Sequence, residues 1–239
     1  MNDRLFARAL LLRTLTTAEF LTLLSAAIIG AAAAGAGAAS ANVAEDAVAT
    51  RLLNGVPQMI FVLLVLVSPL AVIRLATADR AVGWTAPVFA AGGSAVTYAF
   101  ALAASVSLAS VAALVTPLLA FHLNAGTFGA QLLAQILTGS LSLIVLCAYA
   151  AVLWVLLYEA HRALVAMLAL WLGPLGVGFY FAVATDMTDS PLWLRFLLGF
   201  VPPIRLSTTF APALVQAAYI VALAGVLVLL APRRLPVWR

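Results

Sequence analysis

Six long apolar runs fill most of this 239-residue chain, and they restrict it to folds that cross a membrane. Hydrophobic residues make up 66% of the sequence, charged residues only 8%, and the mean hydropathy is +1.18. A water-soluble globule needs a mostly polar exterior, which this composition cannot supply. A helix needs about 20 apolar residues to cross the hydrocarbon core of a bilayer. The runs therefore predict an all-α, polytopic membrane protein with six transmembrane helices.

We expect these helices at residues 18–38, 57–75, 94–120, 130–157, 163–184 and 210–231. The longest gaps between them, near 39–56 and 185–209, are shorter than a stable independent domain. Residues 1–239 are therefore interpreted as one transmembrane domain, with no appended catalytic or binding module.

The arginines predict the orientation of the helices in the membrane. All 12 basic residues are Arg, and no Lys is present. With six spans, one side holds Arg4, Arg8, Arg13, Arg74, Arg80, Arg162, Arg233, Arg234 and Arg239, and the other side holds Arg51, Arg195 and Arg205. Because cytoplasmic loops carry the excess of positive charge, the nine-to-three split predicts that both termini face the cytoplasm. The dispersed arginines do not predict nucleic-acid binding, which requires basic residues clustered on one face.

The missing lysine also excludes several kinds of enzyme. A phosphate-binding P-loop needs a Lys, and so does Schiff-base catalysis. The two histidines, His122 and His161, are expected at opposite membrane faces, so they cannot share a metal ion. Ser140 lies about 15 Å inside the fourth span, away from both histidines, which argues against an intramembrane serine protease. We therefore predict no catalytic site, no metal site and no cofactor bound by this chain.

A polar stripe follows the fourth span. Its members, Gln131, Gln135, Thr138 and Ser142, are spaced by four, three and four residues and so share one helix face. The third span carries a similar set at Ser94, Thr97, Tyr98 and Ser105. Such stripes either hold helices together or line a substrate path, and we favour the first. Small residues in the first span, including Gly30, Ala34 and Gly35, likewise indicate close helix packing.

A short helix is expected between the fifth and sixth spans. Asp186-Met-Thr-Asp-Ser190 precedes Pro191, which places a Ser N-cap before a Pro at the first helical position. The helix carries Trp193, Arg195 and Phe196, and Pro202-Pro203 ends it. About eleven residues cannot cross a bilayer, so this segment is predicted to be a re-entrant or interfacial helix.

With these features in place, the chain resembles the permease subunits of ABC-2 type transporters. One motif is Ala78-Asp79-Arg80-Ala81-Val82-Gly83-Trp84-Thr85-Ala86-Pro87-Val88-Phe89-Ala90-Ala91, in the loop after the second span, where the family has an acid-Arg pair, a Gly and an apolar helical turn. The coupling helix of the family would then correspond to residues 79–91. The others are the segment from Pro191 to Pro203 and the basic N-terminus, which is similar to the family's interfacial elbow helix. In this chain the first motif is poor in charge, and Trp84 stands where a small polar residue is usual.

The resemblance implies how such a protein works. Two permease chains, as a homodimer or a heterodimer, form a substrate pathway in the inner membrane. Asp79, Arg80, Gly83, Trp84, Pro87 and Val88 are then expected to form a coupling helix that contacts a separate cytoplasmic ATPase subunit. ATP and magnesium are expected in that partner, and export is the usual direction.

Two alternatives remain open from the residues themselves. The chain could be a non-transporting scaffold or assembly subunit of a membrane enzyme complex. It could also be a six-span secondary transporter, although no Asp, Glu or Arg lies near the middle of an expected span. The sequence does not identify a substrate.

Overall fold

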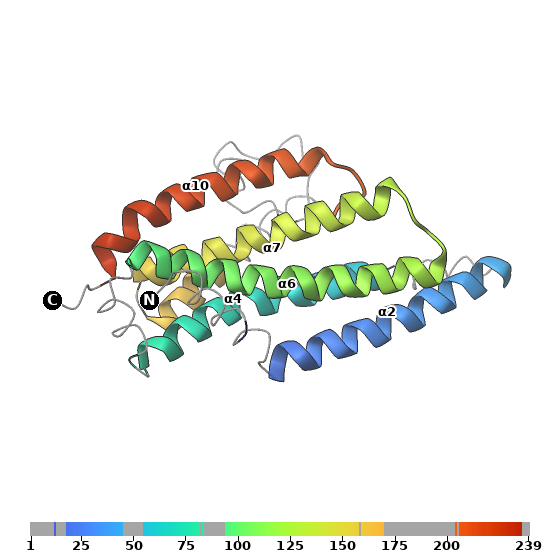
Figure 1. Ribbon diagram of the computed structural model, residues 1–239, viewed down its shortest axis with the longest axis horizontal. Coiled ribbons are helices and arrows are strands. Elements are labelled where there is room, and N and C mark those ends of the chain that lie inside the picture. Colours follow the sequence, from blue (N-terminus) through green and yellow to red (C-terminus); the bar gives the residue numbers. More distant parts are fainter. Residues whose placement is uncertain are drawn as a thin grey trace, which may run out of the picture.

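A computed structural model of the chain describes residues 12, 18–44, 55–81, 83, 94–157, 159–169, 204 and 206–235. Within these ranges every regular element is a helix and no strand occurs. The elements are α2 (Ala18–Ala44), α4 (Val56–Ala81), α6 (Ala95–Ala125), α7 (Ala130–Leu157) and α10 (Ala211–Arg234), with a shorter helix at Ala160–Ala169 (Figure 1). The expected all-α fold is confirmed.

Most of the described helices have the length and composition of membrane spans. Four of them, α4, α6, α7 and α10, are long and apolar enough to cross a bilayer. α2 contributes a shorter apolar stretch, Leu24–Ser40, and Ala160–Ala169 is shorter still. The expected fifth span, 163–184, lies within the described residues only as far as residue 169. The coarse architecture is therefore confirmed, and the count of six crossings stays a prediction.

The centre of the bundle is the antiparallel pair α6 and α7 (Figure 1). α2 packs chiefly on α6, α10 packs chiefly on α7, and α4 contacts both central helices. Completely buried side chains such as Leu102, Leu114, Leu143 and Leu146 fill the core between them. α10 is the least covered of the four long spans, because only 17% of its apolar stretch is buried, against 56% or more in the others.

The ends of α6 follow ordinary capping chemistry. Ser94 is the N-cap, and its hydroxyl accepts a hydrogen bond from the backbone N–H of Thr97 at 2.9 Å. At the other end Gly126 takes the left-handed conformation, with φ of 66°, and its N–H reaches the carbonyls of His122 and Leu123. The helix was expected to end at residue 120, so it is one turn longer than its hydrophobic pattern indicates.

α4 also extends beyond its expected end, and here the difference affects the candidate site. The sequence predicted a helix to residue 75 and a loop at Asp79-Arg80, but α4 continues to Ala81. The Thr77 hydroxyl donates to the Ile73 carbonyl at 2.7 Å, and no Gly or Pro occurs until Gly83. With nothing to stop it, the helix continues past its most apolar part.

The small residues of α2 do not all lie at a helix contact. A Cβ added at Gly35 would lie 2.5 Å from the backbone oxygen of Phe121 and 2.8 Å from Cβ of Asn124, both in α6. Ala31, Ala34 and Ala38 are buried beside it. Gly30 is exposed, with nothing within 4 Å of an added Cβ. Gly35 therefore allows the close approach of α2 to α6, and Gly30 does not take part in it.

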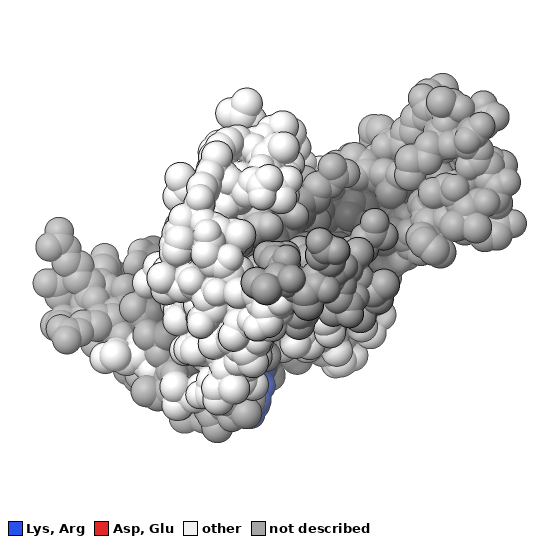
Figure 2. All heavy atoms as spheres, turned by 90° about the vertical axis from the view of Figure 1, so that its right-hand side faces the viewer, with Lys and Arg blue, Asp and Glu red and all other residues white. Residues whose placement is uncertain are grey.

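The described Arg80, Arg162 and Arg233 lie at one end of the bundle, which we name the arginine end. There the C-terminal ends of α4, α7 and α10 meet the N-terminal end of α6 (left in Figure 1). Arg80 lies in the last turn of α4, Arg233 is near the end of α10, and Arg162 follows α7 closely. The opposite end faces the viewer in Figure 2, where the described surface is almost wholly uncharged.

Candidate functional site

A buried carboxylate joins three helices at the arginine end. Asp79 of α4 is completely buried, and its Oδ2 accepts a hydrogen bond from the Tyr98 hydroxyl of α6 at 3.0 Å. The Tyr98 ring, 1% exposed, lies 6.4 Å from the Trp154 ring of α7 at an angle of 56°. Buried carboxylates need such donors, because desolvating an unpaired charge is costly. We name this group the Asp79 cluster; it ties α4 to the two central helices.

The Asp79 cluster changes the interpretation of the acid-Arg pair. The sequence placed Asp79 and Arg80 together in a loop, where both could meet a partner protein. In the structure Asp79 faces the core, whereas Arg80 is exposed in the last helical turn. Gly83 follows with φ of 71°, and its N–H donates to the Arg80 carbonyl at 3.2 Å. Arg80 and Gly83 are thus accessible to a partner, and Asp79 is not.

Several predicted site residues lie outside the described residues. In the expected coupling segment these are Trp84, Pro87 and Val88. In the expected re-entrant helix they are Pro191, Trp193, Arg195, Phe196, Pro202 and Pro203. The basic N-terminal residues Arg4 and Arg8 also lie outside the described residues. Their roles stay predictions.

All four residues of the polar stripe of α7 are described, and the part near the start of α7 contacts a histidine. Gln131 is exposed, while Oε1 of Gln135 lies 3.1 Å from Nε2 of His122 on α6. Nδ1 of His122 lies 2.7 Å from the carbonyl oxygen of Thr127 and 2.8 Å from its hydroxyl. His122 is 7% exposed, and both of its ring nitrogens have partners, one in the α6–α7 turn and one in α7. His122 thereby joins the end of α6 to the turn and to the start of α7.

The second half of the stripe, Thr138 and Ser142, contacts the C-terminal part of the chain. The Thr138 hydroxyl donates to the Ala134 carbonyl at 2.7 Å and accepts from the Ser207 N–H at 3.0 Å. One turn further, the Ser142 hydroxyl accepts from Nε2 of Gln216 on α10 at 2.9 Å, and both side chains are completely buried. The Ser142–Gln216 bond joins α7 to α10, and Thr138 joins α7 to Ser207 in the segment before α10. Sequence reasoning missed Gln216, although an isolated Gln inside an apolar span is itself a signal of such a partner.

The Ser142–Gln216 pair should show a measurable coupling between α7 and α10. We expect Gln216→Leu alone and Ser142→Ala alone each to lower the thermal midpoint in detergent. The double variant should lose less stability than the two single variants together. The difference, which is the coupling energy, should be about 0.6–1.7 kcal/mol, the range of interhelical hydrogen bonds in membranes. Exposed Gln131→Leu is the matched control and should change little. Strict additivity of the two single changes would contradict this pairing.

In the part of the chain that the structure describes, the other titratable residues form no larger group. Glu159 accepts from Nε of Arg162 at 2.8 Å and lies 3.4 Å from Nε2 of His161, all at an exposed helix start. Among the described residues, no three of His, Cys, Asp and Glu gather in a way that could hold a metal ion. Cys147 is a free, fully buried residue in the middle of α7.

Comparison with known proteins adds no relative. No protein-family model, no curated protein and no solved structure matches this chain.

Proposed function

We propose that this chain is the transmembrane subunit of an ATP-binding-cassette transporter of the ABC-2 type, which exports its substrate as one of two permease subunits. The observation that carries the proposal is the end of α4. There Asp79 is fixed to Tyr98 in the core, Arg80 is exposed, and Gly83 turns the chain immediately before the apolar segment 84–91. A partner that binds residues 84–91 would act on three helices through the Asp79 cluster.

The proposal includes a finer topology. Six spans, an N-terminal interfacial helix and a re-entrant helix at 191–200 would place both termini in the cytoplasm, in the inner membrane. The arginine end supports this orientation, because Arg80, Arg162 and Arg233 gather there and positive charge marks the cytoplasmic side.

Mechanistically, the partner ATPase would bind ATP and magnesium and close. Closure would move residues 84–91, and the Asp79 cluster would carry that movement into α6 and α7. This is a binding event at one site that biases an equilibrium between inward-facing and outward-facing states at another. This chain would contribute no catalytic residue to hydrolysis.

The proposal is tested first by affinity purification of the full chain from its native membrane. A P-loop ATPase at stoichiometric amounts is expected. A redox or biosynthetic enzyme in its place would indicate a scaffold subunit, and isolation of the chain alone would indicate a secondary transporter. Either result would contradict the transport proposal.

The contact itself is tested with two variants of that complex. Trp84→Ala should weaken ATPase association about 30-fold or more, because a desolvated aromatic anchor is worth roughly 2 kcal/mol or more. Arg80→Ala should act more weakly and lose its effect at high salt, as rim charges do. Association and substrate-stimulated hydrolysis at unchanged levels in Trp84→Ala would exclude residues 84–91 as the coupling segment.

A further inference from the structure

One exposed side of α10 is an apolar stripe that ends in an arginine. Ala222, Val226, Leu229 and Arg233 are spaced by four, three and four residues, so they share one helix face. All four side chains are exposed, Val226 to 37% and Leu229 to 61%. We name these four residues the α10 stripe.

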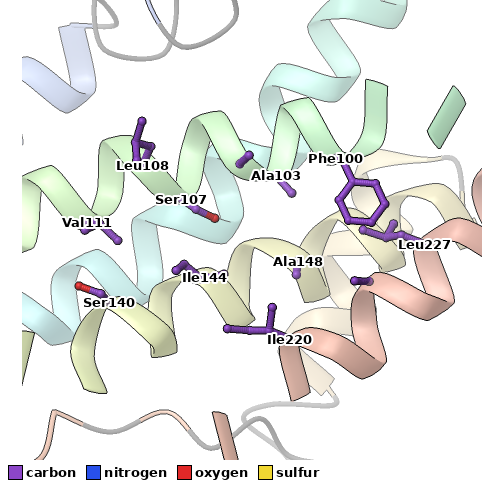
Figure 3. A pocket seen from close by; sticks show the side chains of 12 residues that line it. Phe100, Ala103, Ser107, Leu108, Val111, Ser140, Ile144, Ala148, Ile220 and Leu227 are labelled. Carbon is purple, nitrogen blue, oxygen red and sulfur yellow. The ribbon is translucent and has the colours of Figure 1, made fainter. Parts of the chain in front are cut away.

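The contacts of α10 within the chain lie on a different side of the helix. Gln216, Leu223 and Leu227 are buried there. Ile220 and Leu227 also line an apolar crevice between α10, α6 and α7 (Figure 3). Only 17% of the apolar part of α10 is buried, against 56% or more in the other three long spans. The fold of this chain therefore leaves the α10 stripe uncovered.

Arg233 gives the α10 stripe a positive charge at one end. In the part of the chain that the structure describes, its guanidinium forms no ion pair and no hydrogen bond. α10 itself contains no Asp or Glu that could neutralise the charge. A guanidinium has five N–H donors in a planar fork that matches the oxygens of a phosphate. An anion from outside the chain can therefore bind at this end of the stripe.

The length of the α10 stripe corresponds to one leaflet of a bilayer. Ala222 and Arg233 are 11 residues apart, or about 16 Å along the helix axis. The hydrocarbon core of a bilayer is about 30 Å thick, so one leaflet is about half of that. Arg233 lies in the last turn of α10, at the arginine end. A phospholipid of that leaflet can place its phosphate at Arg233 and an acyl chain along Leu229 and Val226.

The charge argues against a second copy of this chain on the same face. Two copies in one membrane pack around an axis along the membrane normal, so the same residue of each copy meets at the same depth. A dimer through the α10 stripe would bring two Arg233 side chains together, and α10 supplies no acid between them. Like charges in contact are unfavourable, whereas the phosphate of a lipid is attracted.

We propose that the α10 stripe is a binding site for a phospholipid with an anionic headgroup, in the leaflet at the arginine end. The Arg233 guanidinium holds the headgroup phosphate, and the acyl chain packs along Leu229, Val226 and Ala222. An anionic headgroup is preferred to a zwitterionic one, because a choline group competes with Arg233 for the phosphate. The site does not require an ATPase partner, so it stands apart from the transport proposal.

The test uses two phospholipid probes with the same photoactivatable acyl chain, one a phosphatidylglycerol and the other a phosphatidylcholine. The full chain is reconstituted into phosphatidylcholine nanodiscs with each probe at the same low fraction and irradiated, and the labelled residues are mapped by mass spectrometry. We expect the phosphatidylglycerol probe to label residues 222–229 about fivefold more, the factor expected from one Arg near an anionic surface. Exposed Leu133, near the start of α7, should be labelled equally by both.

Three variants make the test specific. Arg233→Gln should remove the preference at residues 222–229, whereas Arg233→Lys should keep most of it, because an ammonium also binds phosphate. Arg162→Gln is the matched control, since Arg162 is exposed at the same end but pairs with Glu159, and it should leave the preference unchanged.

Two results would overturn the proposal directly: equal labelling of residues 222–229 by the two probes, and a preference that survives Arg233→Gln. Resistance of residues 222–229 to both probes would also overturn it, because a second copy or another protein would then cover the α10 stripe.

Discussion

Replacing Gly35 by valine is expected to loosen α2 from α6 and to cost about 3 kcal/mol. An added Cβ would lie 2.5 Å from the Phe121 carbonyl oxygen, and a backbone atom cannot move aside as a side chain can. Overpacking of this kind typically costs 1–3 kcal/mol, and a backbone clash belongs at the upper end. The thermal midpoint in detergent should therefore fall by roughly 6–12 °C.

Gly30→Val is the matched control for this change. Gly30 lies in the same helix, but nothing approaches its added Cβ within 4 Å, so its midpoint should stay within about 2 °C of the parent. Equal midpoints for Gly35→Val and Gly30→Val would mean that α2 does not approach α6 as described.

Asp79→Ala is expected to have the second large effect. It removes the carboxylate that accepts the Tyr98 hydroxyl in a completely buried position. Hydrogen bonds to charged groups contribute about 1.5–3 kcal/mol, so the variant should lose roughly 2 kcal/mol of stability. Arg80→Ala, one residue further along and exposed, should change stability little.

A double-mutant cycle separates the Asp79–Tyr98 bond from general damage to the helix end. Tyr98→Phe removes only the hydroxyl and keeps the ring beside Trp154. If the bond stabilises the cluster, Asp79→Ala should cost much less in the Tyr98→Phe background than in the parent. The same cost in both backgrounds would exclude that bond as the reason for the burial of Asp79.

Hydrophobic patterning predicted the positions of the long helices well. α7 was expected at residues 130–157 and occupies them, because an uninterrupted apolar run leaves the backbone no alternative in a bilayer. The pattern failed at helix ends that carry polar residues. His122 and Asn124 seemed to lie beyond α6, yet Asn124 donates to the Ala120 carbonyl and His122 is satisfied by Thr127 and Gln135.

The candidate site was harder to predict, for a physical reason. Whether a polar residue faces water or a partner depends on contacts between distant parts of the chain. Asp79 and Tyr98 are 19 residues apart, and Ser142 and Gln216 are 74 apart. No local spacing rule relates them. The helical period did place Thr138 and Ser142 on one face, and both meet the C-terminal part of the chain there.

The hydrogen bond between Ser142 and Gln216 can act as a pivot point for α10. Gln216 lies in the second turn of α10, and only 17% of the helix's apolar stretch is buried. Leu227, which lines an apolar crevice between α6, α7 and α10, is 11 residues away, or about 16 Å along the helix axis. If α10 tilted by about 10° around Gln216, Leu227 would move by roughly 3 Å, because the displacement is the product of the tilt angle and the distance from the pivot. The mouth of the crevice would then widen without breaking the hydrogen bond that holds α10 in place.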